Sequence, residues 1–435
     1  MNHDQPEVSA WTPRNIYGLV ALALATGAGF IAMGSFGTVQ EGAKAELGLS
    51  DYAVSVVTGV SAAVPLALLS IPIGILVDRF ARVRLLILLA ALWTAGTLLT
   101  ALASDAQILF VARMMTATGA TGGLTAALSL AADLCRPEER GRATLAVSLG
   151  QRVGIAAAFG LAGWLFGQFV HDTIGGFGHG APWRRVHLAL AIVVGLLALP
   201  LLFMREPERR EVESDTHARF GVVFRELWAR RGFLVPLFAG QIGVVMADTA
   251  AAVWAPAVLS RSYGQHPQDF AGWLGLMIFG TGIVGAVLGG VSADLGQKGT
   301  RRGGILLGAV IAAGIGIPVG LFSIMPNVTM LAVALGVLVT CGTITGIVVA
   351  IVLTVLLPNE LRGLCIGLFI AMAGLIGYGI APPLVAAVSQ LLGGEQHLNL
   401  ALAIVVTTVS AISFIAFAQA MRRAPRSATH AEPIG

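Results

Sequence analysis

The feature that most constrains this chain is a succession of apolar segments of about 20 residues, the length that a helix needs to cross the hydrocarbon core of a bilayer. These segments lie near residues 16–39, 52–77, 83–103, 106–133, 142–169, 184–204, 233–260, 270–292, 303–324, 328–356, 362–392 and 398–420. Only 11% of the residues are charged and 56% are hydrophobic, whereas soluble domains carry about 25% charged residues. The sequence therefore predicts an all-α membrane protein with twelve transmembrane helices.

Small residues recur at helical spacing within these segments. Glycines four residues apart let helix backbones approach closely in a membrane, where no hydrophobic effect drives helices together. The pairs are Gly150/Gly154, Gly163/Gly167, Gly285/Gly289 and Gly363/Gly367. The alternation that is typical of β-barrel strands is absent, so the segments are predicted to form a helical bundle.

Basic residues lie mainly in alternate links between the apolar segments. Cytoplasmic loops are enriched in Lys and Arg, and most of the 27 Lys and Arg residues fall in links that are cytoplasmic if the N-terminus is inside. Both termini are therefore predicted to be cytoplasmic, with the protein in the inner (plasma) membrane of a bacterium. The pI near 9.3 reflects this topology, and no nucleic-acid partner is predicted.

A short pattern recurs at the ends of the second and eighth apolar segments, where Gly74-x-x-x-Asp78 is matched by Gly290-x-x-x-Asp294. Halves related in this way are the organisation of secondary transporters with parallel repeats. We therefore predict two pseudo-symmetric six-helix bundles. The predicted parts are an N-terminal bundle (1–204), a cytoplasmic inter-bundle loop (205–231), a C-terminal bundle (232–423) and a cytoplasmic tail (424–435).

The charges beside Asp78 are suited to a cytoplasmic gate. A carboxylate at the end of a helix can pair with nearby bases and with the positive end of a neighbouring helix. Such bonds must break when the cytoplasmic side opens, and Asp294 would be the weaker latch because fewer bases adjoin it. The predicted gate residues are Gly74, Asp78, Arg79, Arg82, Gly290 and Asp294. The alternative is that they only set topology and terminate the helices.

Three charged residues, Arg113, Arg152 and Asp248, lie well inside predicted helices, away from the helix ends. A charge at the bilayer centre costs roughly 2.5–3.5 kcal/mol on insertion scales, so such residues usually serve a function. Two cations and one carboxylate at one cavity would favour an anionic or zwitterionic substrate held by an arginine fork, and Asp248 would couple transport to protons. The alternative is structural pairing or snorkelling. Neutral candidates for substrate binding are Gln151, Gln241, Trp254 and Tyr378.

Signals for other chemistry are weak. His171, His179 and His187 are spaced poorly for a metal site, and the three cysteines form neither a disulfide framework nor a zinc pattern. No phosphate-binding loop, nucleophile elbow or zinc-binding helix motif is present. The chain is therefore predicted not to be an enzyme and to need neither a cofactor nor a metal.

The sequence resembles the major facilitator superfamily in three motifs. "GILVDRFARVR" (74–84) is similar to the family's cytoplasmic loop between helices two and three, and "GGVSADLGQKGTRR" (289–302) to its degenerate second copy. "ARMMTATGATGG" (112–123) is similar to the Arg-containing motif of helix four. The resemblance implies the major facilitator fold and rocker-switch alternating access. It would place Arg113 and Asp248 on cavity-lining helices of opposite halves.

A narrower resemblance is to bacterial spinster-like members of that family. It rests on "LGLSD" (47–51), "IPIGILVDRFARVR" (71–84), "ADLCRPEERGRA" (132–143), "WRRV" (183–186), "REPERR" (205–210) and "WAPAVLSRSYG" (254–264). One departure matters, because the family's Asp-Arg pair on the first helix falls at Ala32-Met33 when counted back from "LGLSD". If that pair carries coupling in relatives, this chain must couple differently or not at all.

Together these patterns predict a monomeric secondary transporter in the lipid bilayer. Its substrate would be a small organic anion or amphiphile, lysolipid-like or a carboxylic acid, with protons as the candidate coupling ion. One alternative is a multidrug-type proton antiporter that exports hydrophobic compounds. An alternative of another class is a membrane sensor or scaffold that does not transport.

Overall fold

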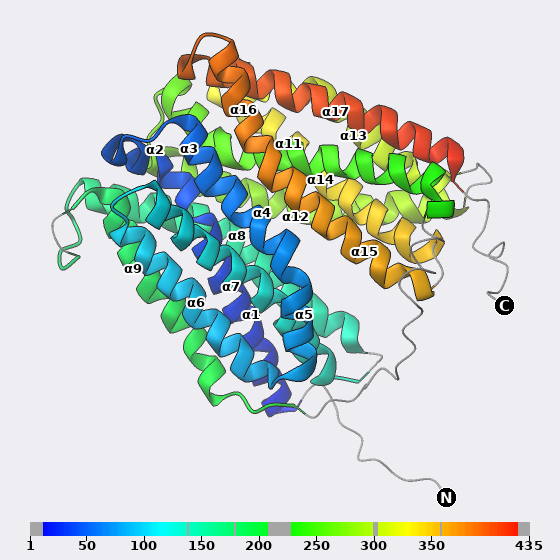
Figure 1. The fold of residues 1–435 in the computed structure, drawn as a ribbon, viewed down its shortest axis with the longest axis horizontal. Coiled ribbons are helices and arrows are strands. Elements are labelled where there is room, and N and C mark those ends of the chain that lie inside the picture. Colours follow the sequence, from blue (N-terminus) through cyan, green and yellow to red (C-terminus); the bar gives the residue numbers. More distant parts are fainter. Residues whose placement is uncertain are drawn as a thin grey trace, which may run out of the picture. The chain divides into compact units, whose positions relative to one another are not determined.

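A computed structural model describes residues 12–136, 139–177, 180–207, 228–298, 303–356 and 359–424. The secondary structure of this part of the chain is helical, with no strand in it. The predicted inter-bundle loop lies mostly outside the described residues, as does almost all of the predicted tail and His179. The helices form two compact units, and Figure 1 shows the path of the chain through them.

The first unit comprises residues 1–50, 68–213 and 267–276. Within it α1 packs against α7, α8 and α9, and α6 packs against α7 and α9. Apolar side chains such as Leu22, Trp93 and Leu190 fill its core. Its helices are α1 (Pro13–Gly34), α2 (Phe36–Leu47), α5 (Ser70–Arg79), α6 (Arg82–Leu102), α7 (Ala106–Asp133), α8 (Arg140–Val170), α9 (Pro182–Ala198) and the 3₁₀ turn η4 (Leu199–Phe203).

The second unit comprises residues 51–67, 214–266 and 277–435. Its most extensive helix packing is between α11 (Arg231–Tyr263) and α17 (Leu398–Arg423). Figure 1 shows the red α17 alongside α11 and α13. The other elements are α3 (Asp51–Ser55), η1 (Val56–Val60), α4 (Ser61–Val64), η5 (Gly304–Leu306), α13 (Leu307–Val319), η6 (Gly320–Ile324), α14 (Val328–Leu356), α15 (Asn359–Ala373), η7 (Gly374–Tyr378), α16 (Gly379–Leu391) and η8 (Glu395–His397). Two elements have residues in both units, η2 (Pro65–Leu69) and α12 (Pro267–Lys298).

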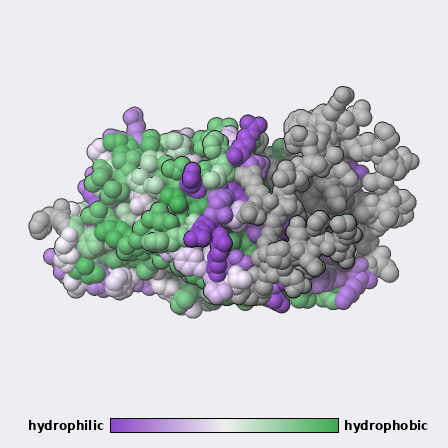
Figure 2. Space-filling model, turned by 90° about the horizontal axis from the view of Figure 1, so that it is seen from below, coloured by the Kyte–Doolittle hydropathy of each residue, from purple (hydrophilic) through white to green (hydrophobic). Residues whose placement is uncertain are grey.

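Eleven helices among the described residues are long and apolar enough to cross a membrane. They correspond to the predicted segments except that near 106–133, which forms α7. α7 is long enough at 28 residues, but Arg113, four threonines and three glycines lower its hydropathy. Large apolar side chains such as Leu102, Phe203 and Leu276 are exposed, and Figure 2 shows apolar residues over much of the face it draws. This surface is suited to lipid.

The predicted glycine pairs mark close helix contacts in three of four cases. A Cβ at Gly150 or Gly154 would overlap backbone atoms of α1, and one at Gly163 would overlap the start of α12. Gly285 and Gly289 meet α14 in the same way. Gly367 is different, because open space surrounds the position of its missing Cβ. Close packing at the first three pairs is confirmed, and the fourth pair makes no such contact at Gly367.

Candidate functional site

Arg113 of α7 lies inside the first unit, against the end of α1, and its side chain is only 6% exposed. The guanidinium donates to the backbone carbonyl oxygens of Ala32, at 3.1 Å, and of Met33. Because α1 ends at Gly34, these carbonyls belong to its last turn, where the helix dipole favours a cation. The Phe36 ring lies 5.4 Å from the guanidinium carbon and adds a cation–π contact.

Arg113 lacks an acidic partner in the part of the chain that the structure describes. No carboxylate pairs with it there, and its Nε atom has no hydrogen-bond acceptor. The spinster-like resemblance places an acid at Ala32, but here the guanidinium meets the backbone carbonyl of that residue. A buried guanidinium with an unused donor is suited to binding a carboxylate, sulfonate or phosphate.

Arg152 and Gln151 lie on α8 and do not join this group. The Arg152 side chain is exposed and Gln151 is half-buried. Gly150 and Gly154 face α1, and a residue two positions from each lies about 200° around the helix from them. Arg152 therefore projects away from α1. The first unit does not bring the two arginines into the single site that the sequence predicted.

Asp248 of α11 lies in the second unit beside α14, and its side chain is half-buried. A Cβ at Gly342 would overlap both carboxylate oxygens, so the glycine provides the room that Asp248 occupies. A cavity of about 10 Å³ adjoins the carboxylate and is also lined by Cys341, Thr345 and Ser410. This volume is close to the roughly 10–15 Å³ that one water molecule requires.

Gln241 lies two helical turns before Asp248, on the same face of α11. It is 5% exposed, and its Oε1 atom has no hydrogen-bond partner among the described residues. A Cβ at Gly346 of α14 would lie 3.8 Å from its Nε2 atom. Gln241 and Asp248 therefore form a polar strip on α11 that faces a glycine strip, Gly346 and Gly342, on α14.

Trp254 and Tyr378 also belong to the second unit. Trp254 is fully buried, and its indole N–H donates to the carbonyl oxygen of Pro382 at 3.1 Å. In this structure its nitrogen is thus engaged by the protein, and the substrate role of Trp254 stays a prediction. Tyr378 is half-buried at the end of η7, which packs against α11. Tyr378 therefore lies on an element beside the helix that carries the polar strip.

The predicted gate residues are mostly exposed. Asp78, Arg79 and Asp294 carry exposed side chains, and Gly74 and Gly290 have open space where a Cβ would lie. No ion pair involves Asp78 or Asp294 among the residues that the structure describes. The structure therefore does not show the paired form of the gate that the sequence predicted.

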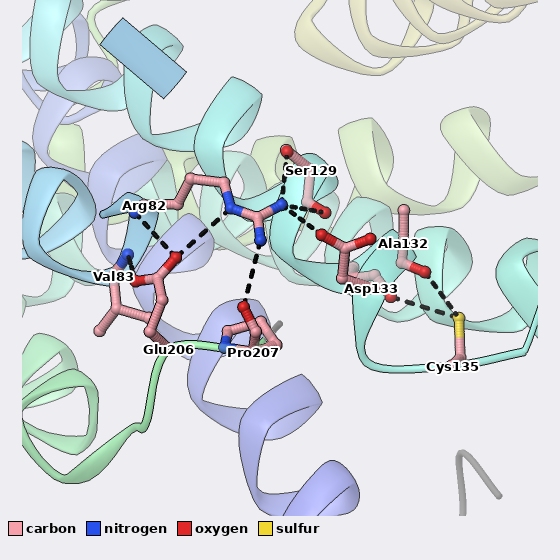
Figure 3. Close-up of polar contacts among 9 residues, drawn as sticks. Arg82, Val83, Ser129, Ala132, Asp133, Cys135, Glu206 and Pro207 are labelled. Carbon is pink, nitrogen blue, oxygen red and sulfur yellow. Dashed lines mark hydrogen bonds and ion pairs between the residues drawn. The ribbon is translucent and has the colours of Figure 1, made fainter. Parts of the chain in front are cut away.

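Arg82 has partners other than Asp78, as Figure 3 shows. It is 4% exposed and forms ion pairs with Asp133 at the end of α7 and with Glu206. The Glu206 carboxylate also accepts the backbone N–H groups of Arg82, at 2.9 Å, and Val83, at 2.8 Å. These are unpaired donors at the start of α6, which a carboxylate satisfies. Arg82 thus joins α6, α7 and the chain after η4 inside the first unit.

Several residues near these sites were not predicted from the sequence, although some of them lie in recognisable motifs. Glu206 lies within the quoted "REPERR" motif, and Gly342 and Gly346 form a further pair at four-residue spacing. His187 was considered only as a metal ligand, yet the structure buries it fully in the first unit. Among the described residues, no group of three or more His, Cys, Asp or Glu side chains is arranged to hold a metal ion.

Comparisons with known proteins agree with this architecture. The sequence profile of the Major Facilitator Superfamily matches residues 22–382. A probable 4-methylmuconolactone transporter of Cupriavidus pinatubonensis is 28% identical over 347 residues, 77% of this chain and 73% of that protein. A 3-(3-hydroxy-phenyl)propionate transporter of Escherichia coli is 33% identical over 135 residues, 31% of this chain and 30% of that protein. A probable sulfoacetate transporter of Cupriavidus necator is 25% identical over 62% of this chain and 63% of that protein.

Solved structures show the same fold. The crystal structure of a bacterial homologue of the human lysosomal transporter Spinster, inward-facing and unoccupied, has a TM-score of 0.79 at 22% identity. The structural match covers 97% of this chain and 100% of the Spinster homologue. A crystal structure of the nucleoside transporter NupG has a TM-score of 0.72 at 11% identity and covers 92% of this chain and 99% of that one. The chain is a multi-pass membrane transporter and belongs to the Major Facilitator Superfamily, whose members here are transporters and not enzymes.

Proposed function

We propose that this protein is a secondary active transporter of small organic anions, with Arg113 as the anion-binding residue. The observation that carries the proposal is the buried guanidinium, which is held by two backbone carbonyls and has no carboxylate partner among the described residues. An organic anion would supply the acceptor that Nε lacks and would neutralise the charge. The helices that cover Arg113 would separate in one state of the transport cycle.

The substrate class is narrowed by the neighbours of Arg113 and by the relatives. Phe36 lies against the guanidinium, so an aromatic or unsaturated carboxylate would find both a charge and a ring surface. The names of the relatives include a propionate and a sulfoacetate, which are organic acids. A lysolipid-like amphiphile is the second candidate, because the similarity to the Spinster homologue shows the fold alone. Arg152, exposed on α8 and apart from Arg113, is proposed as a contact for the anion at another stage of transport.

Asp248 is proposed as the residue that couples transport to protons. Its carboxylate adjoins a cavity the size of about one water molecule, and Gly342 gives it room. Gln241 and Tyr378 are proposed to border the same site. A carboxylate in an apolar bundle binds a proton more readily than one in water, because burial disfavours the charged form. Proton binding there can therefore be coupled to a change in packing between α11 and α14.

We further propose that the loops at Asp78 and Asp294 latch the cytoplasmic side and that both termini are cytoplasmic, in a bacterial inner membrane. The protein would act as a monomer. In a state that is closed on the cytoplasmic side, Asp78 would pair with bases that it does not meet here. Arg82 is engaged by Asp133 and Glu206, so in that state Asp78 would need another of the nearby bases.

The direct test is uptake into proteoliposomes of a panel of organic acids, lysolipids and hydrophobic cations, with and without an imposed pH gradient. Uptake of organic acids that is lost in Arg113→Ala supports the proposal. Lysolipid uptake alone would favour the amphiphile, and proton-driven exchange of hydrophobic cations would favour a multidrug antiporter. Binding without any transport would indicate a sensor or scaffold. Organic-acid uptake that survives Arg113→Ala refutes the role of Arg113.

A further inference from the structure

His187 of α9 is a buried imidazole with one nitrogen engaged and one open. The residue is 0% exposed, and its Nδ1 atom lies 2.8 Å from the carbonyl oxygen of Trp183. A carbonyl oxygen only accepts hydrogen bonds, so Nδ1 carries the hydrogen and Nε2 presents a lone pair. No hydrogen-bond partner of Nε2 is found in the described part of the chain. Nε2 is therefore a position where a proton can bind.

Phe36 connects this imidazole to the proposed anion site. The ring centroids of Phe36 and His187 are 5.8 Å apart, and the Arg113 guanidinium carbon lies 5.4 Å from the centroid of the same Phe36 ring. Arg113 and His187 therefore both lie against the Phe36 ring. While Arg113 is uncompensated, a proton on His187 would therefore meet a like charge in surroundings of low dielectric.

The charged groups at the start of α9 are engaged with other partners. Glu46 binds Trp183 and Arg184, and Arg185 binds Asp172. The titratable groups on α9 and on the helices packed against it are Arg14 and Tyr17 (α1), Glu41, Lys44 and Glu46 (α2), Arg82 and Arg84 (α6), Arg140, Arg142 and Arg152 (α8), and Arg184 and Arg185 (α9). Arg113 of α7 is joined to the imidazole through the Phe36 ring.

We infer that His187 is a proton-binding site linked to the anion site at Arg113, so that a proton and an organic anion bind cooperatively. The inference rests on the proposed function. An anion that neutralises Arg113 removes the repulsion on a protonated imidazole, and by linkage a proton on His187 strengthens anion binding by the same factor. The proton adds to Nε2 and yields an imidazolium, whose charge the anion offsets. Anion affinity therefore increases as the pH falls.

The test is equilibrium binding of 3-(3-hydroxyphenyl)propionate to the purified full-length protein by calorimetry. Measurements at about pH 5 and about pH 8 reach below the usual imidazole pKa of about 6.5, because burial disfavours the charged imidazole, and the carboxylate stays mostly ionised at both pH values. The wild type is expected to bind more tightly at the lower pH, by up to about tenfold, the effect of a one-unit linkage. His187→Asn keeps a side-chain N–H for Trp183 and cannot bind the proton, so its affinity should not vary with pH. His171→Asn, at an exposed histidine of the same unit, should behave as the wild type.

A wild-type protein that binds the anion equally at both pH values overturns the inference, as does His187→Asn with the wild-type pH dependence. Wild-type calorimetry in two buffers of different ionisation enthalpy gives a second readout that does not depend on the variant folding. Proton uptake on anion binding is expected, and its absence contradicts the linkage. The proposed function fails separately, if the wild type binds none of the organic acids in the panel.

Discussion

Removing Arg261 is expected to destabilise the second unit much more than neutralising its partner, Asp51. Asp51 is the first residue of α3, and Arg261 lies in the last turn of α11. Two guanidinium nitrogens of Arg261 reach the two carboxylate oxygens of Asp51, each at 2.7 Å. The Asp51 side chain is 0% exposed, whereas that of Arg261 is 23% exposed. Glu395 lies on the other side and accepts the Asp51 backbone N–H at 2.7 Å.

The difference in exposure sets the expected magnitudes. Arg261→Gln leaves the Asp51 carboxylate buried near the like charge of Glu395, and breaking a buried ion pair in this way costs about 3–5 kcal/mol. Asp51→Asn leaves a cation that reaches solvent through its exposed part, so the loss is that of charge-assisted hydrogen bonds, about 1.5–3 kcal/mol. The double variant Asp51→Asn/Arg261→Gln should be less destabilised than Arg261→Gln alone.

The measurement is chemical denaturation of each purified variant in detergent micelles, analysed as a double-mutant cycle. Asp172→Asn is the control, because Asp172 is 79% exposed in its 2.7 Å pair with Arg185 and its φ of 52° suits asparagine. Loss of that pair should cost about 0–1 kcal/mol. The reasoning is refuted if Arg261→Gln costs no more than the control, or if Asp51→Asn is the more destabilising single change.

Three further predictions follow from the site and its surroundings. Gly342→Ala should abolish proton-driven accumulation of substrate in proteoliposomes, because the added Cβ displaces the Asp248 carboxylate. Gly346→Ala is the control and should keep accumulation, because its Cβ makes only an ordinary contact at 3.8 Å. Equal effects of the two variants would contradict the role of Asp248. Ala32→Asp should weaken anion binding about tenfold or more, because it gives Arg113 an internal carboxylate. Ala32→Asn is the control for side-chain size. Equal anion affinity of the two variants would contradict the role of Arg113. Hydrogen bonds from the backbone N–H of Ile108, and also from Ser104 and the N–H of Gln107, hold the pKa of Asp105 below its usual 3.8. That stabilisation is present above the unfolded-state pKa and is lost as the pH falls through the lower folded-state pKa, so the wild-type stability advantage over Asp105→Asn should vanish on acid titration below about pH 4.

The helices were predictable from the sequence because lipid imposes the same requirement on every span. A run of about 20 apolar residues must satisfy its backbone within itself, so the predicted segments match the observed helices closely, α7 included. Glycine spacing also predicted where on α8 and α12 a neighbouring helix comes close, and the structure identifies these neighbours as α1 and α14. These features depend on local pattern, which the sequence carries directly.

Side-chain partners were not predictable in the same way, since they depend on which helix faces lie together. Arg82 was expected to join the charges around Asp78, yet it pairs with Asp133 and Glu206, residues 51 and 124 positions away. Counting residues placed Arg152 and Arg113 at one cavity, but Arg113 contacts the last turn of α1, whereas Arg152 lies beside an earlier part of α1 and projects away from it. Depth follows from counting residues, whereas rotation and partner choice require the packed bundle.

The departure from the spinster-like pattern at Ala32 gives Arg113 its proposed role. An aspartate there would neutralise the guanidinium with an internal charge, and an external anion would then have to compete with it. The carbonyls of Ala32 and Met33 stabilise the cation only through partial charges at the end of α1, so its net charge remains. Burial without neutralisation is costly in an apolar bundle, and the binding of an anion recovers that cost. In the proposed function, the missing acid leaves the guanidinium at this end of α1 open to an anion, and a proton on His187 would link the binding of that anion to pH.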